Sequence, residues 1–323
     1  MNMEATPTPH NTLVPATLPA QFLPIAEKKF VPPTAGEIIT SFRTQNTYTI
    51  GSSIGEGNFG MVYSCTDTWN NELAVKVLKP RGLPYDKIKA AGEAEFFKLV
   101  ALRHPSITYI YDAFEYRDTF YIVTERCLGP VSGLFNLPNF DGHQWIMPIA
   151  RCLLQAVHFL HINNLVHQDI HSGNVFTTFV KDEMPTEAKA LQFKLADMGV
   201  AKLFQEVDGQ NTRNNLILPP EVLRSAEFGP MDYHIDLYHV GLLLLQLAYS
   251  KEMIFTEEEI LAGKPRELAE ALPPPLNFAL SKALRRHVPS RTSSAMELWR
   301  DLNTSMPTTP PELQAPVAAQ PPP

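Results

Sequence analysis

HQDIHSGN occupies residues 167–174 and follows the stretch NNLV at 163–166. It places an aspartate, Asp169, five residues before an asparagine, Asn174. Oxygen atoms of such side chains are ligands for hard cations such as Mg²⁺, and a carboxylate can also accept the proton of a reacting hydroxyl. An aspartate in a loop can equally serve as a turn cap. The rest of the chain therefore decides between a catalytic and a structural loop.

The composition is that of a folded, mildly acidic protein. Of the 323 residues, 44% are apolar, which is enough for one large domain or two modest ones. The formal net charge of -7 gives no electrostatic reason to expect nucleic acid or an anionic membrane as a partner. The three cysteines, Cys65, Cys127 and Cys152, are far apart and lack metal-ligand spacing. This pattern predicts a reducing, cytoplasmic environment without disulfides.

No stretch of the sequence predicts targeting to a membrane. The first residues, MNMEATPTPHNTL, have neither a basic start nor an apolar core, so we expect no signal peptide. The longest apolar run, VGLLLLQLAY at 240–249, is shorter than the ~20 residues that cross a bilayer. We therefore expect a buried core helix there and no membrane partner.

Two segments rich in Pro and Thr flank the central region. Residues 1–47 and 303–323 show little periodicity, and we expect both to be poorly ordered. Pro307 and Pro310 form a PxxP motif that no basic residue flanks. A passive tail is the favoured interpretation, and binding of a partner through the Pro-rich tails is the alternative.

The central region changes from strand patterns to helix patterns. Its first part, 48–127, contains short runs of β-branched and aromatic residues around one helical stretch at 86–102. Helical patterns dominate after about residue 141. This order predicts an α+β fold with a small antiparallel-sheet lobe plus one helix at 48–127 and a larger, mainly helical lobe at 128–302. A cleft between two lobes is a common ligand site.

The segment IGEGNFGMV at 54–62 contains three glycines, Gly55, Gly57 and Gly60. Without side chains, glycines let backbone N–H groups approach phosphate oxygens closely. The following MVYSCT run is typical of a strand, whereas a dinucleotide-binding turn leads into a helix. We interpret the segment as a hairpin loop over a nucleotide, with a purely structural turn as the alternative.

The strand-like run LAVKVL at 73–78 places Lys76 between apolar neighbours. A lysine in such a strand is usually an edge or surface residue, and a buried lysine needs a partner of opposite charge. Glu95, on the helical stretch that follows, is the candidate partner. Held by Glu95, Lys76 would be a fixed cation for the phosphates of a nucleotide.

These segments, in this order, resemble the eukaryotic-type (Hanks-type) Ser/Thr protein kinase family over about residues 48–302. The resemblance rests on the Gly-rich loop, the lysine strand, the helix glutamate and the motifs that follow them. Those motifs are RHP (103–105), HQDIHSGN (167–174), ADMG (196–199), LPPE (218–221) and DLYHVG (236–241), with Arg291 at the position that pairs with Glu221.

The resemblance implies transfer of the γ-phosphate of ATP to Ser or Thr hydroxyls of a protein substrate, with Mg²⁺, or alternatively Mn²⁺, as the metal. Asp169 would accept the proton of the hydroxyl, and Asn174 and Asp197 would hold the metal. The implied catalytic set is Asp169, Lys76, Glu95, Asn174 and His171. The residues implied for nucleotide binding are Ile54, Gly55, Gly57, Gly60, Val62, Ala74, Lys76, Thr124, Glu125, Cys127 and Asp197, of which the backbone at 125–127 would bond to adenine.

Several residues depart from the family pattern. Gln168 replaces the arginine that receives an activation-loop phosphate, so we expect a non-RD kinase whose activity does not depend on that phosphorylation. His171 replaces the lysine typical of Ser/Thr kinases, which leaves Ser/Thr as a preference over Tyr. Met198 replaces the DFG phenylalanine and is expected to pack as a flexible apolar side chain.

Two further segments are unusual for the family. In the short stretch before LPPE, Asn214 and Ile217 replace the usual Thr and Tyr, so the target sequence is left open. The stretch FVKDEMPTEAKALQF at 179–193 is longer than this hairpin usually is, and we interpret it as a polar surface insertion.

Two other functions remain as alternatives. Aminoglycoside-type phosphotransferases carry a loop resembling HGDxHxxN, whose second histidine is matched by HQDIHSGN. LPPE, DLYHVG and Arg291 favour the protein kinase, because these features shape a groove for a protein substrate. A nucleotide-binding pseudokinase scaffold is the non-enzyme alternative, and the presence of Lys76, Asp169 and Asp197 disfavours it.

Overall fold

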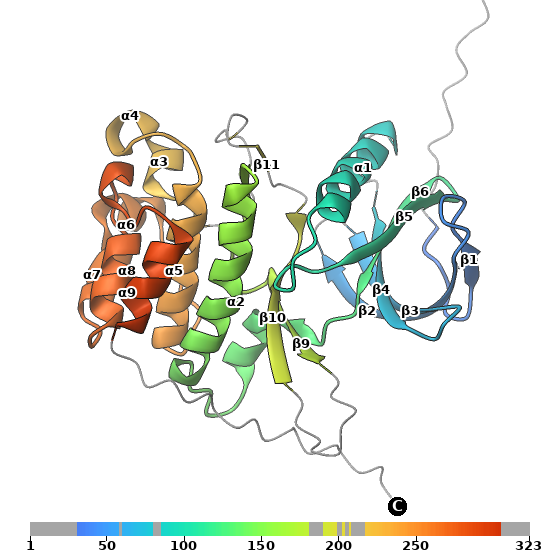
Figure 1. The fold of residues 1–323 in the computed structure, drawn as a ribbon, viewed down its shortest axis with the longest axis horizontal. Coiled ribbons are helices and arrows are strands. Elements are labelled where there is room, and N and C mark those ends of the chain that lie inside the picture. The colour runs from blue at the N-terminus through green and yellow to red at the C-terminus, as the bar shows by residue number, and fades with distance from the viewer. Residues whose placement is uncertain are drawn as a thin grey trace, which may run out of the picture.

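The computed structural model describes residues 31–57, 60–79, 85–180, 190–198, 202–203, 207 and 217–304. These residues form two lobes, one built on a six-stranded sheet and the other mainly helical (Figure 1). Helix α1 lies with the sheet, and the remaining helices gather in the other lobe. The predicted α+β, two-lobed fold is confirmed.

The smaller lobe contains an antiparallel sheet in the order β1-β2-β3-β4-β6-β5. Its strands are β1 (Ile38–Thr40), β2 (Thr47–Gly57), β3 (Gly60–Asp67), β4 (Glu72–Leu78), β5 (Ile110–Tyr116) and β6 (Thr119–Glu125). On one face the rings of Tyr48, Phe114 and Tyr121 stack in series, with centroid distances of 5.8 and 5.6 Å. β-Branched and aromatic side chains suit a pleated, half-buried surface, which explains why these runs form strands.

Strand β1 lies within the N-terminal segment that the sequence predicted to be poorly ordered, and that prediction is wrong for residues 31–47. This segment is tied to the lobe by polar contacts. The Thr44 hydroxyl donates to the buried Asp112 carboxylate, and the Arg43 guanidinium lies 4.7 Å from the ring centroid of Phe96 on α1. Contacts between residues so distant in sequence leave no local pattern, and a three-residue strand is too short to show alternation.

Helix α1 (Tyr85–Ala101) forms within the predicted helical stretch and packs against β5 and β6. Gly92 faces the sheet, where a Cβ atom would lie 2.4 Å from the Phe120 side chain. The missing side chain therefore lets the helix backbone approach the sheet closely. An ion pair between Lys89 and Glu115, with a distance of 2.9 Å, adds a second link. Together these contacts fix α1 on the sheet.

Two helices form the centre of the larger lobe. α2 (His143–Ile162) packs against α5 (His234–Ala248), α9 (Ala295–Asn303) and β10. Nearly every residue of α5 is buried, so the apolar run that begins at residue 240 is a core helix, as the sequence predicted. α2 is long and apolar enough to cross a membrane, but a helix packed inside a core meets the same criterion, and the buried side of α2 contacts other elements of the lobe.

The other elements of this lobe are short. They are β7 (Gly129–Pro130), η1 (Val131–Asn136), β8 (Leu165–Val166), β9 (Val175–Val180), β10 (Ala190–Leu195), β11 (Lys202–Leu203), α3 (Pro220–Leu223), α4 (Ser225–Phe228), α6 (Glu257–Ala262), α7 (Lys264–Glu270), α8 (Leu276–Ala283) and η4 (Val288–Ser290). β9 and β10 form an antiparallel hairpin. The predicted insertion at 179–193 begins and ends in this hairpin, and its residues 181–189 lie outside the described part of the chain.

His239 on α5 is a buried histidine that should control the acid stability of the larger lobe. Burial lowers its pKa to about 4 and outweighs the attraction of Asp236. Its Nε2 lies 3.2 Å from the Ile217 main-chain oxygen, and Nδ1 has no hydrogen-bond partner among the described residues. The folded state therefore keeps the ring neutral, while the unfolded chain binds a proton near pH 6.5. The contribution of the neutral His239 to the free energy of unfolding is therefore fully present above pH 6.5 and is lost as the pH falls toward 4.

Between pH 7.5 and 5, the titration of His239 should lower the free energy of unfolding of the wild type by about 2 kcal/mol. We expect His239→Gln to lack this decrease, because glutamine does not titrate. Urea unfolding at several pH values measures this slope for wild type and variant. His143→Gln, at an exposed position on α2, is the matched control and should keep the wild-type slope. Parallel pH curves for wild type and His239→Gln would contradict the expectation.

Candidate functional site

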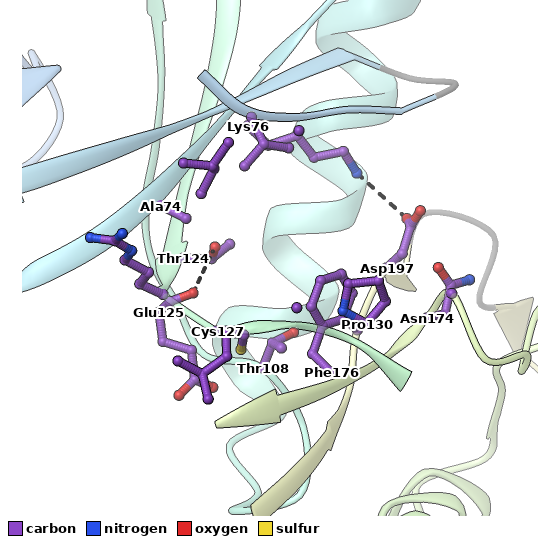
Figure 2. A pocket seen from close by; sticks show the side chains of 18 of the residues that line it. Ala74, Lys76, Thr108, Thr124, Glu125, Cys127, Pro130, Asn174, Phe176 and Asp197 are labelled. Carbon is purple, nitrogen blue, oxygen red and sulfur yellow. Dashed lines mark hydrogen bonds and ion pairs between the residues drawn. The ribbon is translucent and has the colours of Figure 1, made fainter. Parts of the chain in front are cut away.

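A cavity of about 500 Å³ lies between the lobes (Figure 2). This volume is within the range of about 300–1,000 Å³ that is common for small-molecule sites. Its lining residues are Ile54, Gly55, Glu56, Gly60, Val62, Ala74, Lys76, Thr108, Ile110, Thr124, Glu125, Arg126, Cys127, Leu128, Gly129, Pro130, Gly173, Asn174, Phe176, Ala196 and Asp197. The set contains the residues implied for nucleotide binding other than Gly57, which lies at the end of β2 opposite Gly60.

Lys76 on β4 and Asp197 after β10 point toward one another in the cavity (Figure 2). Lys76 Nζ is 3.5 Å from Asp197 Oδ1. Asp197 has a φ of 60°, in the left-handed region that few residues other than glycine adopt. The residue before it is held on both sides, because the Ala196 N–H donates to the main-chain oxygen of Asn174 at 2.9 Å and the Ala196 C=O is 3.0 Å from His167 Nε2. Such contacts allow a strained backbone to persist.

Some predicted site residues are not placed by the structure. Glu95 lies on α1, but its side chain is outside the described residues, so its pairing with Lys76 stays a prediction. Thr212 and Asn214 also lie outside them. Met198 is described and is fully buried, in agreement with the packing role expected for it.

Asp169 lies in the loop between β8 and β9, with 1% of its surface exposed. Asn174 Nδ2 donates to its main-chain oxygen at 2.9 Å and to its Oδ2 at 3.1 Å. The other carboxylate oxygen, Oδ1, is 3.6 Å from His171 Nε2. The Gly173 N–H donates to His171 Nδ1 at 3.1 Å, so a neutral His171 carries its proton on Nε2, toward Asp169. Asn174 thus holds one oxygen of the carboxylate by a hydrogen bond, and His171 lies beside the other.

Asp236 on α5 organises this loop from inside the lobe. Its Oδ2 accepts from the His167 N–H at 2.9 Å and lies 2.9 Å from His161 Nε2, while its Oδ1 accepts from the Gln168 N–H at 2.8 Å. Burial would raise the pKa of this carboxyl, but the hydrogen bond to His161 and the neighbouring His167 hold it below its ordinary value. Gln168 has a φ of 66°, and the bond to Asp236 helps to hold that conformation.

Asp236 was recognised in the sequence as part of a motif and was not predicted as a residue of the site. The signal that could have found it is a carboxylate at the start of a long apolar helix. A charged side chain is rarely buried without partners, so such a position implies donors from elsewhere in the fold.

Asn174 and Asp197 both line the cavity with oxygen-bearing side chains. Because Asn174 Nδ2 donates to Asp169, the oxygen of the same amide is turned away from that carboxylate. Within the described ranges no donor bonds to this oxygen. An amide oxygen and a carboxylate are donors that Mg²⁺ and Mn²⁺ accept, so the two residues fit the implied metal.

The connection after β6 forms the opposite end of the cavity. The N–H and C=O of Cys127 make no main-chain hydrogen bond within the described ranges, so both can bond to a ligand. The Thr124 hydroxyl donates to the Glu125 main-chain oxygen at 3.3 Å (Figure 2). Burial raises the pKa of the Cys127 thiol to about 12, and the charge of Glu125 acts in the same direction. The thiol is therefore protonated at neutral pH and is a packing group.

Glu221 on α3 and Arg291 after η4 form a bidentate ion pair, and neither side chain is exposed. Arg291 Nε also donates to the main-chain oxygen of Arg285 at 2.7 Å. The predicted pairing of Glu221 with Arg291 is confirmed. It anchors the LPPE segment to the C-terminal part of the larger lobe.

Comparison with known proteins identifies the family. A family model described as "Protein kinase domain" matches residues 48–307. The chain belongs to the protein kinase family. The family resemblance predicted from the Gly-rich loop, the lysine strand and the later motifs is thereby confirmed.

Curated relatives of this kinase domain are serine/threonine kinases. The RAF proto-oncogene serine/threonine-protein kinase of Xenopus laevis is 30% identical over 207 residues, which cover 61% of this chain and 30% of that protein. The serine/threonine-protein kinase TAO3 of Xenopus laevis is 29% identical over 209 residues, 62% of this chain and 22% of that protein. The serine/threonine-protein kinase fused of Drosophila melanogaster is 26% identical over 200 residues, which cover 61% of this chain and 23% of that protein. The chain thus spans less than a third of the length of each of these relatives.

Proposed function

We propose that this kinase domain transfers the γ-phosphate of ATP to Ser or Thr hydroxyls of protein substrates, with Mg²⁺ as its metal. The observation that carries the proposal is one grouping of side chains. Lys76, Asn174 and Asp197 line a single cavity, and Asn174 is hydrogen-bonded to the buried Asp169. The names of the relatives support Ser and Thr as acceptors.

The side chains divide the chemistry among them. Lys76 places a positive charge where the phosphates of ATP would lie, and the backbone of Cys127 offers hydrogen bonds for adenine. Asn174 and Asp197 would hold Mg²⁺, which neutralises phosphate charge when it is bound. Asp169 orients the substrate hydroxyl and takes its proton, Asn174 keeps its carboxylate in place, and His171 lies 3.6 Å from the other carboxylate oxygen.

Phosphorylation of a small molecule is the second candidate. The observation that favours it is His171, which matches the second histidine of the aminoglycoside-type loop. The buried pair of Glu221 and Arg291 favours a protein acceptor, because it anchors the segment on which a peptide would dock.

A labelling experiment separates these functions. Purified protein is incubated with Mg²⁺ and ATP labelled at the γ-phosphate, once with a mixture of generic proteins and once with aminoglycosides. We expect label on Ser and Thr of the proteins. Label on the sugars would support the small-molecule function. Nucleotide binding without any transfer would support a pseudokinase scaffold.

The proposal includes activity without activation-loop phosphorylation, supported by Gln168. An uncharged glutamine has no charge to pair with a phosphate. Thr212 is the one Ser or Thr between ADMG and LPPE. We therefore expect Thr212→Ala to keep kcat/KM within about twofold of wild type. Thr304→Ala is a matched control outside the site. A loss of more than tenfold in a folded Thr212→Ala variant would contradict the expectation.

A cytoplasmic location is a further part of the proposal. The three free thiols of the described chain are compatible with a reducing compartment. Microscopy of a fluorescently tagged chain tests the location. Binding of an SH3-type partner by the segment around Pro307 and Pro310 is a weaker proposal, which a pull-down with the tail peptide tests.

A further inference from the structure

Lys194 on β10 reaches from the larger lobe to the connection between the lobes. Its Nζ lies 2.8 Å from both carboxylate oxygens of Glu125, the last residue of β6 in the smaller lobe. The side chains of Lys194 and Glu125 are 6% and 16% exposed. A largely buried ion pair therefore joins the lobes at the place where the chain passes from one to the other.

The same carboxylate also holds the main chain beside it. Glu125 Oε1 accepts from the Tyr109 N–H at 2.8 Å, and the Glu125 N–H donates to the main-chain oxygen of Tyr109 at 3.0 Å. Lys194 Nζ lies 4.4 Å from the centroid of the Tyr109 ring, which adds a cation–π contact. Moving Glu125 would break its hydrogen bonds to both neighbours, so the position of this residue is strongly constrained.

Both members of the pair lie on segments of the chain that line the cavity. Glu125 itself lines the end where adenine would bond. Lys194 lies three residues before Asp197, which lines the metal end. The end of β10 that leads to Asp197 is fixed as well, since Leu195, the last residue of this strand, forms a parallel bridge with Ile107. The pair thus connects the two ends of the site through short, hydrogen-bonded segments.

We infer that Lys194 is a positioning residue for the nucleotide, and that its pair with Glu125 sets the adenine-binding backbone at a defined place relative to Asp197. This inference rests on the proposed function, because it assigns the affinity of that site for the base. A buried ion pair adds little net stability but restricts geometry. Its loss should therefore weaken binding of the base more than it slows phosphoryl transfer.

The experiment compares two probes that each occupy half of the site, adenosine and Mg²⁺-tripolyphosphate, in direct binding measurements. We expect Lys194→Met to weaken adenosine binding and to raise KM for ATP about tenfold, a size typical of coupling through a positioning residue. Affinity for tripolyphosphate and kcat should stay within about twofold. Lys282→Met, which removes a lysine paired with Glu297 and Asp301 away from the cavity, is the matched control and should change neither affinity.

The outcomes are distinct. Unchanged adenosine affinity in Lys194→Met would overturn the inference, and so would an equal loss for both probes, which indicates general loosening of the fold. If Lys194→Met does not fold because Glu125 is left buried and uncompensated, the double variant Glu125→Gln/Lys194→Met replaces it and is held to the same tenfold selective loss. A folded wild-type protein that binds neither probe would overturn the proposed function itself.

Discussion

Asp169→Asn is expected to lower kcat by roughly 10²–10⁴-fold, because a positioned acid–base group contributes an effect of that size. Asparagine keeps the shape of the side chain, and its amide oxygen can still accept the hydrogen bond from Asn174. The fold and the affinity for nucleotide should therefore be retained. Steady-state kinetics with labelled ATP, together with the Kd of the nucleotide, measure the two quantities separately.

The matched control is Asp86→Asn, an exposed aspartate in the first turn of α1. This variant should behave as wild type in both measurements. If Asp169→Asn retained kcat within tenfold at an unchanged Kd, Asp169 would have no part in the transfer. Loss of nucleotide binding along with kcat would instead assign it a structural role.

Arg291→Met is expected to lower the free energy of unfolding by about 3–5 kcal/mol, the usual cost of leaving one member of a buried ion pair without its partner. Glu221 and Arg291 are both fully buried, so neither water nor salt can compensate the charge that remains. Urea or thermal unfolding of wild type and variant measures the difference.

The double variant Glu221→Gln/Arg291→Met sharpens this test. Because it leaves no buried charge, it should recover part of the loss, and the recovered part is the cost of the unpaired carboxylate. Lys264→Met breaks an exposed pair with Glu267 and should change stability by less than about 1 kcal/mol. A single variant as stable as wild type would mean that Glu221 gains other donors.

Much of the fold followed from local patterns. The strands β3 to β6 contain β-branched and aromatic runs, and the core helix α5 coincides with a long apolar run. Strand β1 was missed, because Thr44 and Arg43 attach the segment around it through Asp112 and Phe96, which lie far along the chain.

In the site, too, the motifs identified individual residues, whereas contacts between residues far apart in the chain were not predicted. The motifs singled out Lys76, Asn174 and Asp197, and the structure brings all three to one cavity. The ionic contact of Lys76 with Asp197 is not among the predictions from the sequence. The predicted pairing of Lys76 with Glu95 stays a prediction, because the Glu95 side chain lies outside the described residues. Asp236 was named within a motif, but its bonds to the catalytic loop could not be read from spacing.

By itself, the sequence determined the family, the lobes and the side chains able to hold a nucleotide and a metal, because glycine spacing, apolar runs and motif order are local properties of the chain. The tertiary structure decided which charges meet. Lys76 is 121 residues from Asp197 and Lys194 is 69 residues from Glu125, yet each pair is in contact. Coulomb attraction and hydrogen bonds depend on distance in space and on burial, and folding alone sets both.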